Sequence, residues 1–305
     1  MSAQVADSTG VGVEAPVHGG SPGARGRRSR VRGSAGGRLA VLPLLVFTAL
    51  AFGVPALAMA DGAFVSGGHY TTANLVASLQ GGALTALLGS VKLCSLAALI
   101  AAVLGLLVAQ AVVTSRFGAL RRAVLTASGV LANFGGVPLA FAFVATLGNA
   151  GVITQHLGLA KYGWSLYSFW GLLLVYLYFL VPLMVLTVMP ALDGLRGQWR
   201  EAAQNNGATT LKYWLHVALP VLAPSLLGGY VLLFGSAFAA YATAAAMVGA
   251  SVPLITLQIA NALNGNVLVG QTNIALAMSL DMVIVAGLVM AVYLPLQKRS
   301  ARWLV

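Results

Sequence analysis

The chain alternates between long apolar segments and short polar connections. Six of the apolar segments are long enough to cross a bilayer, since a spanning helix needs about 20 apolar residues. Backbone polar groups in lipid must be satisfied within their own segment, so each of the six is expected to be a helix. The pattern therefore predicts an all-α integral membrane protein with six transmembrane helices. They are expected at residues 39–60, 93–113, 123–147, 166–189, 226–248 and 274–296.

Two prolines and two connecting segments modify this pattern. Pro138 and Pro182 fall inside predicted spans, where they are expected to mark kinks. Residues 61–90 are rich in Gly, Ser and Thr and are expected to form a loop between the first two spans. The apolar segment 253–263 is too short to span, so we expect a re-entrant or interfacial helix that lines a path.

The composition agrees with a membrane protein. The chain is 59% hydrophobic and 8% charged, whereas a soluble domain carries about 25% charged residues. Such a chain could bury a large core but could not cover it with a charged surface. Cys94 is the only cysteine, which excludes a disulfide framework within one chain.

The basic residues indicate how the spans are oriented, because cytoplasmic loops carry an excess of Lys and Arg. With a cytoplasmic N-terminus, fifteen of the 17 Lys and Arg residues fall on the inner side, and both termini are expected there. Lys161 falls outside, and Lys92 lies near the expected outer start of the second span, where it can snorkel. This placement makes a nucleic-acid partner unexpected despite the net charge of +11.

The N-terminal residues 1–38 show little hydrophobic periodicity and contain an Arg-rich run. We expect a disordered, basic cytoplasmic tail, followed by a transmembrane domain over residues 39–305. Arg27-Arg28 and the sequence Ala58-Met59-Ala60 leave an export signal open as an alternative. The length of the apolar stretch 39–60 favours an uncleaved first helix.

A polar cytoplasmic loop, residues 191–224, connects the fourth and fifth predicted spans. Glu201-Ala202-Ala203 is expected near the start of a short helix, where the carboxylate would interact with the positive helix end. Gly207 is expected either to end that helix or to let another backbone approach closely.

A second helical stretch is expected to follow in the same loop. Tyr213 and Trp214 are its bulky anchors. Leu219-Pro220, and then Pro224, are expected to break the chain before the fifth span. The loop therefore predicts a helix–Gly–helix element exposed to the cytoplasm.

This element resembles the EAA motif in permease subunits of binding-protein-dependent ABC importers, the MetI-like superfamily. The family pattern is E-A-A, three residues, G, nine residues, an apolar residue, any residue, then L-P. The chain reads Glu201-Ala202-Ala203, Gly207, Val217 and Leu219-Pro220, with Val217 where the family usually has Ile. The resemblance covers residues 84–296 and implies a five-helix MetI-like core plus an N-terminal helix. The run 133–138 also looks like the polyamine, iron and phosphonate branch.

The resemblance implies a function and a set of partners. The loop would form coupling helices that dock on a dimer of cytosolic ABC ATPases, which bind ATP-Mg and hydrolyse it. This chain itself would catalyse nothing and hold no cofactor. A second, non-identical permease, an external solute-binding protein and the lipid of the cell inner membrane are the other expected partners. The expected coupling residues are Glu201, Ala202, Ala203, Gly207, Tyr213, Trp214, Leu219 and Pro220.

Four polar residues are candidates for the translocation path. Asp281 is the only acidic residue inside a predicted span. It either attracts a cationic substrate, or is a helix-end carboxylate near the interface or one bonded to a neighbouring hydroxyl. Asn133, Gln258 and Asn261 either line the path or form interhelical hydrogen bonds. The histidines show no metal-ligand spacing, so no metal site is expected.

The sequence thus favours an ABC importer permease for a small solute, such as a polyamine or another polar or cationic compound. An ion-gradient-driven secondary transporter or channel is the alternative. That class would be expected to show more intramembrane charge and paired broken helices in two repeats.

Overall fold

The computed structural model describes residues 35–249, 251–264 and 271–301. The expected N-terminal tail lies almost entirely outside these residues. The chain divides into two compact units, residues 1–52 and 53–305, and each is described by itself.

In the first unit, α1 (Ala35–Thr48) contains Pro43 and leads into a π-helical turn, η1 (Ala49–Gly53). The second unit begins at the end of this turn. Residues 42–63 form a stretch of helix long and apolar enough to span a membrane, which confirms the first predicted span with a shift of three residues.

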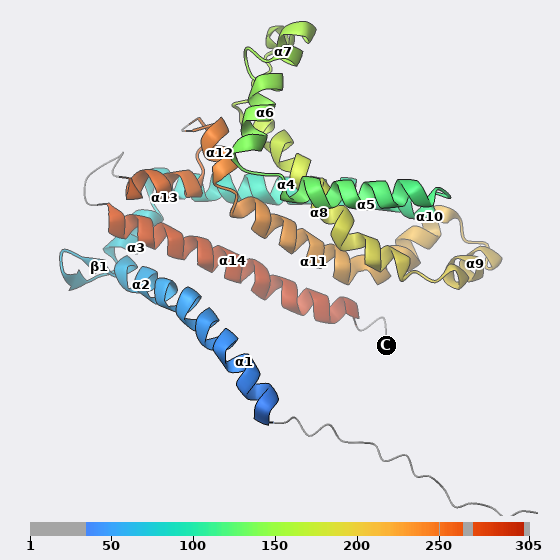
Figure 1. The fold of residues 1–305 in the computed structure, drawn as a ribbon, viewed down its shortest axis with the longest axis horizontal. Helices are drawn as coiled ribbons and strands as arrows, with labels where there is room; N and C mark the ends of the chain where they lie inside the picture. Colours follow the sequence, from blue (N-terminus) through green and yellow to red (C-terminus); the bar gives the residue numbers. More distant parts are fainter. Residues whose placement is uncertain (1–34, 250, 265–270, 302–305) are drawn as a thin grey trace, which may run out of the picture. The chain divides into compact units, whose positions relative to one another are not determined.

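In its described residues, the second unit consists of helices, their connections and one short antiparallel hairpin, in which Val65 pairs with Tyr70. Figure 1 shows the order of its elements. They are α2 (Val54–Ala63), β1 (Val65–Ser66), β2 (His69–Tyr70), α3 (Ala73–Ser78), α4 (Gly81–Thr114), α5 (Gly118–Asn133), α6 (Val137–Leu147), α7 (Val152–Leu157), η2 (Leu159–Tyr162), α8 (Phe169–Asp193), α9 (Gly197–Asn205), α10 (Thr210–Tyr213), η3 (Trp214–Ala218), α11 (Leu219–Phe238), α12 (Ala242–Met247), α13 (Ile255–Leu263) and α14 (Thr272–Ala301).

Helix α8 is the centre of the core, and α4, α5 and α11 pack against it. Met184 of α8 is fully buried and lies between glycines of two neighbouring helices. A Cβ added to Gly105 of α4 would lie 2.5 Å from the Met184 Cβ, and one added to Gly229 of α11 would lie 2.7 Å from its Sδ. Small residues thus let three helices approach closely, as is usual for helices packed in a membrane.

Six stretches of helix in the described residues are long and apolar enough to span a membrane, which confirms the predicted number. The second span, α4, begins twelve residues before its predicted start at residue 93, and the expected loop 61–90 holds the hairpin, α3 and the first turns of α4. Lys92 therefore lies well inside α4 rather than at its start. Its Nζ is 5.7 Å from the ring centroid of Phe169, at the start of α8.

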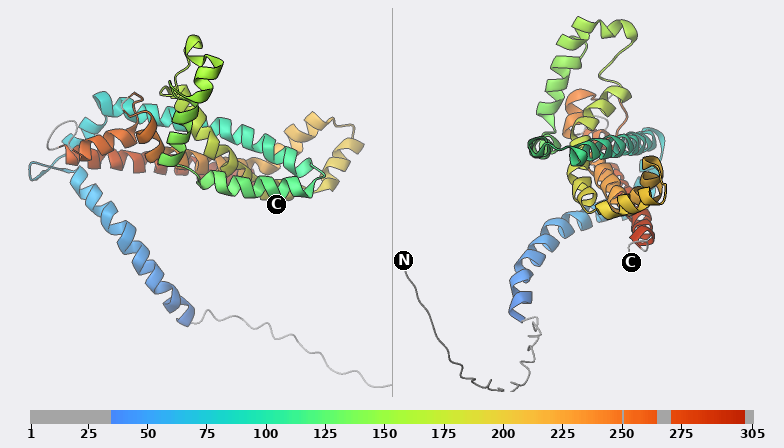
Figure 2. Two further views of the ribbon diagram at one scale, coloured as in Figure 1. Left: turned by 45° about the horizontal axis from the view of Figure 1, so that its top comes forward. Right: turned by 90° about the vertical axis from the view of Figure 1, so that its right-hand side faces the viewer.

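The third predicted span, 123–147, is wrong as a single helix. Phe134, Gly135 and Gly136 separate α5 from α6, and Gly136 has a φ of +77°, which a helix cannot accommodate. Pro138 lies in the first turn of α6, where its missing N–H is no loss, instead of marking a kink inside a span. Both views in Figure 2 show α6 and α7 projecting from the helices of the core.

The fifth predicted span also differs. A continuous helix runs from residue 210 to 238 through α10, η3 and α11, so the expected break at Leu219-Pro220 and Pro224 is wrong. In an α-helix, the N–H of residue 220 would donate to the carbonyl of His216, and Pro220 has no N–H to donate. His216 lies in the π-helical turn η3, where the hydrogen bonds follow a different spacing. The helix therefore continues through Pro220. The helix breaks instead at residues 239–241, where the Tyr176 hydroxyl donates to the Ala240 carbonyl at 2.9 Å.

Two smaller predictions are confirmed in part. Pro182 lies inside α8, as expected, while the kink stays a prediction. The short apolar segment forms the helix α13, which packs on α4 and α14, while its place beside a path stays a prediction. Its first residue, Ile255, is buried and donates its N–H to the Ser90 hydroxyl of α4 at 2.9 Å.

Candidate coupling site

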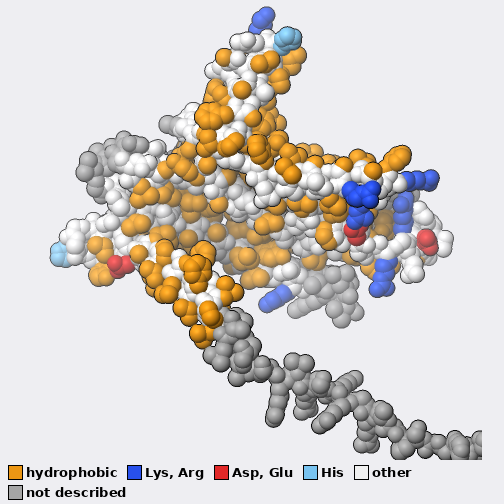
Figure 3. Space-filling model, in the orientation of Figure 1, with side chains coloured by type: hydrophobic (Ala, Val, Ile, Leu, Met, Phe, Trp, Pro, Cys, Tyr) orange, Lys and Arg blue, Asp and Glu red, His pale blue; other side chains and the backbone are white. Residues whose placement is uncertain are grey.

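The candidate site begins where α8 ends. Asp193, the last residue of α8, forms an ion pair with Arg121 near the start of α5. Directly after it, the Arg196 guanidinium lies 5.9 Å from the ring centroid of Trp199. Lys and Arg side chains gather at this end of the second unit, around α5, α9 and α10 (Figure 3). The residues concerned are Arg116, Arg121, Arg122, Arg196, Arg200 and Lys212.

Helix α9 carries Glu201-Ala202-Ala203 and has one inward face. Glu201 and Ala202 are exposed, while Ala203 is half-buried. Glu201 is the fifth residue of α9, and the first turn holds no acidic residue, so the predicted contact with the positive helix end is wrong. Residues 199, 202, 203 and 206 follow helical spacing and face a cavity of about 720 Å³. The cavity is lined by Gly194, Arg196, Trp199, Ala202, Ala203, Asn206, Val217 and Val221.

Gly207 caps the end of α9, which agrees with the first of the two predicted alternatives. Its φ is +74°, and its N–H donates to the Gln204 carbonyl at 2.9 Å. The Ala208 N–H donates to the Ala203 carbonyl, also at 2.9 Å. Such a pair of bonds around a left-handed glycine is a common helix C-cap. A Cβ added at Gly207 would meet no described atom within 4 Å, so the turn is open towards its surroundings.

The second short helix is capped and anchored. The Thr209 hydroxyl accepts a hydrogen bond from the Lys212 N–H at 3.3 Å. Tyr213 is buried and packs edge-to-face with the half-buried Trp214, their ring centroids 6.4 Å apart. Both rings are therefore packed against each other, while their role in coupling stays a prediction.

The sequence analysis did not single out several residues of this site. Leu211 and Leu215 are 68% and 52% exposed, four residues apart on the helix that follows Gly207. Arg121 and Trp199 were also missed as contact residues. Two sequence patterns could have indicated these residues. The leucines are four residues apart, and Trp199 is three and four residues from the two alanines, so each set lies on one helix face. Leu219 and Pro220 are the last two of the expected coupling residues. Leu219 is half-buried and Pro220 is exposed.

A second cavity, of about 540 Å³, lies where the two broken helices meet. The break between α5 and α6 and the break between α11 and α12 both contribute to it, and the Gly136 N–H donates to the Thr243 hydroxyl at 2.9 Å. Asn133 is the one predicted path residue that lines this cavity. The lining is Ala132, Asn133, Gly135, Gly136, Phe179, Leu183, Ser236, Ala239, Ala240, Tyr241, Ala242 and Thr243.

The other three predicted path residues lie elsewhere. Gln258 and Asn261 are on α13, and the Gln258 Nε2 is 3.6 Å from a Cβ added to Gly82 of α4. Asp281 on α14 is 5% exposed and lies beside Ser78 of α3. Its Oδ2 has no hydrogen-bond partner among the described residues. The structure does not bring the four residues into one site.

Comparisons with known proteins identify similar chains. No family model matches the chain. It is 38% identical over 68 residues to the sulfate transport system permease protein CysT of Salmonella typhimurium. The matched residues cover 22% of this chain and 24% of that one. It is 27% identical over 92 residues to the spermidine/putrescine transport system permease protein PotC of Haemophilus influenzae, covering 30% and 36%. The chain thus spans only about a quarter to a third of the length of these relatives.

Solved structures show the same fold over most of the chain. One belongs to a bacterial ABC transporter involved in the import of the acidic polysaccharide alginate, with a TM-score of 0.67 and 17% identity, covering 86% of this chain and 94% of that one. Another is the alginate transporter in complex with a pentasaccharide-bound periplasmic protein, with a TM-score of 0.65, 18% identity and coverage of 86% and 93%. The chain therefore has the fold of these ABC transporter chains, with six described stretches of helix long and apolar enough to cross a membrane.

Proposed function

We propose that this chain is a permease subunit of an ATP-driven ABC importer, which moves a small solute into the cytoplasm. The observation that carries the proposal is the element formed by α9, the Gly207 turn and α10. It follows the span α8 and leads into the span 210–238, at the end where the basic residues gather. It exposes Glu201, Ala202 and Leu211, and Leu215 is exposed just after it in η3. Exposed apolar side chains beside charged ones are typical of a surface that binds another protein, here a cytosolic one.

This element and the relatives support a set of partners. Two cytosolic ABC ATPases, which bind ATP-Mg, would dock on the α9–α10 elements of this chain and of a second, non-identical permease. Closure of the ATPase dimer on ATP would then move the spans joined to each element, here α8 and α11. A similar transporter structure holds a periplasmic protein loaded with its substrate. That complex supports an external binding protein as the source of solute.

The solute path is proposed to pass the cavity between the two helix breaks. Its lining offers hydroxyl, amide and backbone groups from Asn133, Ser236 and Thr243 and contains no charged side chain. A second permease would complete the path on the open side of this cavity. Asp281 does not line the cavity, so any attraction of a cationic solute by Asp281 would act at another place along the path.

The gradient-driven transporter remains the second candidate because two observations favour it. Broken helices meet at one cavity, and Asp281 is a buried intramembrane acid with an unpartnered oxygen. The exposed α9–α10 element favours the ABC importer, because a gradient-driven protein has no need of a docking element for an ATPase.

Uptake into vesicles distinguishes these functions. The chain would be reconstituted with its co-expressed partners, and labelled sulfate and spermidine would be supplied with the matching binding protein. Uptake that requires ATP on the side of α9, and continues when ion gradients are collapsed, is the expected result. Uptake driven by a proton or sodium gradient without ATP would contradict the proposal.

A further inference from the structure

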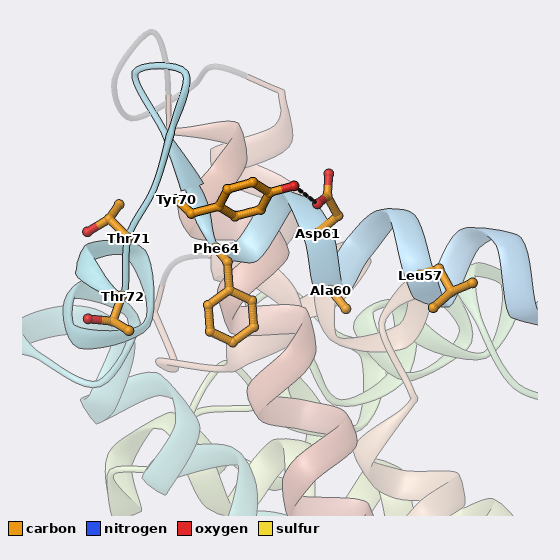
Figure 4. A pocket seen from close by; sticks show the side chains of 7 residues that line it. All are labelled: Leu57, Ala60, Asp61, Phe64, Tyr70, Thr71 and Thr72. Carbon is orange, nitrogen blue, oxygen red and sulfur yellow. Dashed lines mark hydrogen bonds between the residues drawn. The ribbon is translucent and has the colours of Figure 1, made fainter.

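A third cavity, of about 620 Å³, has no role in the proposed transport path. It lies between α2, the β1–β2 hairpin and the residues that lead into α3 (Figure 4). Its walls are mixed, with one carboxylate, one phenol, two hydroxyls, one further aromatic ring and two aliphatic side chains. The lining residues are Leu57, Ala60, Asp61, Phe64, Tyr70, Thr71 and Thr72.

The walls of this cavity are held by a firm scaffold. The buried Asn74 of α3 donates its side-chain amide to the carbonyls of Ala63 at 3.2 Å and Val65 at 2.7 Å. Asn273 of α14 donates to the same Val65 carbonyl at 2.7 Å. The hairpin is therefore tied at its root to two helices. A site on such a scaffold loses little conformational freedom when a ligand binds.

One side of the cavity carries a negative charge. The Tyr70 hydroxyl donates to Asp61 Oδ1 at 2.9 Å, and Figure 4 shows the other carboxylate oxygen directed away from the labelled side chains. This hydrogen bond, and then the charge of Asp61, hold the pKa of Tyr70 above its usual range. Tyr70 thus remains a donor at neutral pH, and the carboxylate keeps an oxygen for a further cation.

The remaining walls suit an organic cation. Phe64 and Tyr70 are 38% and 78% exposed, so their ring faces are available to an ammonium group. Leu57 and Ala60 belong to the span 42–63 and offer aliphatic contact to an alkyl chain. Asp61 lies in the last turns of that span, where lipid headgroups meet the protein. Asp61 would repel an anion and would gain little from an uncharged sugar.

We propose that this cavity binds a primary alkylammonium group, with the ammonium at Asp61 beside the Tyr70 ring and the alkyl part along Phe64, Leu57 and Ala60. Two sources carry this chemistry, the ethanolamine headgroup of a membrane phospholipid and a free linear diamine. Because binding requires neither ATP nor a partner, the inference goes beyond the proposed function and stands or falls separately.

Binding to the purified full chain tests the proposal. The probes are an ethanolamine phospholipid, a glycerol-headgroup phospholipid of the same acyl chains, and putrescine. Native mass spectrometry gives the lipid affinities, and calorimetry gives that of putrescine. Asp61→Asn is expected to weaken ammonium binding about tenfold, the loss of one charge-assisted contact, and Phe64→Leu about two- to fivefold. Asp61→Glu restores the charge, and His69→Gln is the matched control on the same hairpin, since His69 does not line the cavity.

The outcomes separate the two sources. If only the ethanolamine lipid binds in an Asp61-dependent way, the cavity holds a membrane lipid. If only putrescine does so, the cavity holds a free diamine. If both do so, the cavity is a general ammonium site. Equal affinity of wild type and Asp61→Asn for both probes overturns the proposal, as does binding of neither by wild type. Thermal unfolding midpoints confirm that each variant is folded.

Discussion

Gly207 connects α9 and α10 through a backbone conformation that residues with a Cβ rarely adopt. Its φ of +74° and the two C-cap hydrogen bonds set the direction in which the second helix leaves. The open space around this residue makes its position accessible to a docking protein. Gly207 thus combines two properties at this turn, a left-handed conformation and the lack of a side chain.

Substitution of Gly207 is expected to uncouple ATP hydrolysis from uptake. Gly207→Leu places a branched side chain in front of the docking partner and costs about 1–2 kcal/mol for the left-handed conformation. Gly163→Leu is the matched control, because Gly163 has the same φ of +74° but lies in the α7–η2 arm. Uptake per ATP hydrolysed in vesicles should fall for Gly207→Leu and remain for the control. Normal uptake by Gly207→Leu would place the docking site elsewhere.

The Asp61–Tyr70 hydrogen bond is expected to give the Tyr70 phenol a distinct titration. Since the folded chain holds this proton more tightly than the unfolded chain, the pair stabilises the fold below the ordinary phenol pKa. That contribution is lost as the pH rises through the raised pKa. Tyrosinate absorbance, with Tyr70→Phe subtracted, should show Tyr70 titrating at lower pH in Asp61→Asn than in wild type. An unchanged titration would mean that the hydrogen bond is absent in solution.

At the scale of elements, the Arg121–Asp193 ion pair joins the start of α5 to the end of α8, next to α9. Both side chains are partly exposed, at 42% and 38%, so the pair is expected to contribute no more than about 1 kcal/mol to stability. Its position suggests a different role, which is to hold the start of the α9–Gly207–α10 element in place when the proposed ATPase docks there.

Charge reversal tests this role. Arg121→Asp should lower ATP-driven uptake with little change in the unfolding midpoint, because a repulsive pair frees the end of α8. The exchange Arg121→Asp with Asp193→Arg restores an ion pair and should recover uptake. Uptake is to be measured in vesicles at matched protein content. If the exchange fails to recover what the single variant loses, Arg121 acts through another contact.

Element boundaries show where sequence patterns stop being informative. The apolar run 123–147 predicted one helix because hydropathy does not register a turn made of apolar residues and glycine. Gly135-Gly136 was visible in the sequence, but the contact with Thr243 that fixes the break comes from a residue more than a hundred positions away. The prolines had the opposite effect, because Pro220 predicted a helix break that the structure does not show. The π-helical turn before Pro220 keeps that helix continuous.

At the scale of the whole molecule, hydropathy predicted the number of spans, and motif spacing predicted the α9–Gly207–α10 element, because both depend on local sequence. The cavities at the helix breaks and beside the hairpin could not be predicted in this way. Each is built by residues from several elements, and side chains such as Asn74, Asn273 and Thr243 hold those elements together.

The orientation of the spans is a further expectation at this scale. Single cysteines would be placed at the exposed positions Gln204, in α9, and Tyr162, in η2, with Cys94 replaced by serine. A membrane-impermeant maleimide is expected to label Tyr162→Cys in cells with a permeable outer envelope, and Gln204→Cys only after the inner membrane is opened. Labelling in the reverse order would invert the proposed topology.

The central claim is that an ATPase docks on the α9–Gly207–α10 element. Its most direct test is co-purification in mild detergent, with the bound chains identified by mass. Wild type would be compared with the double variant Glu201→Arg, Gly207→Leu, and with the control Lys161→Glu, Gly163→Leu in the arm. An ABC ATPase that accompanies wild type and the control but not the double variant is the predicted result. An ATPase that stays bound to the double variant, or is absent from wild type, would contradict the account.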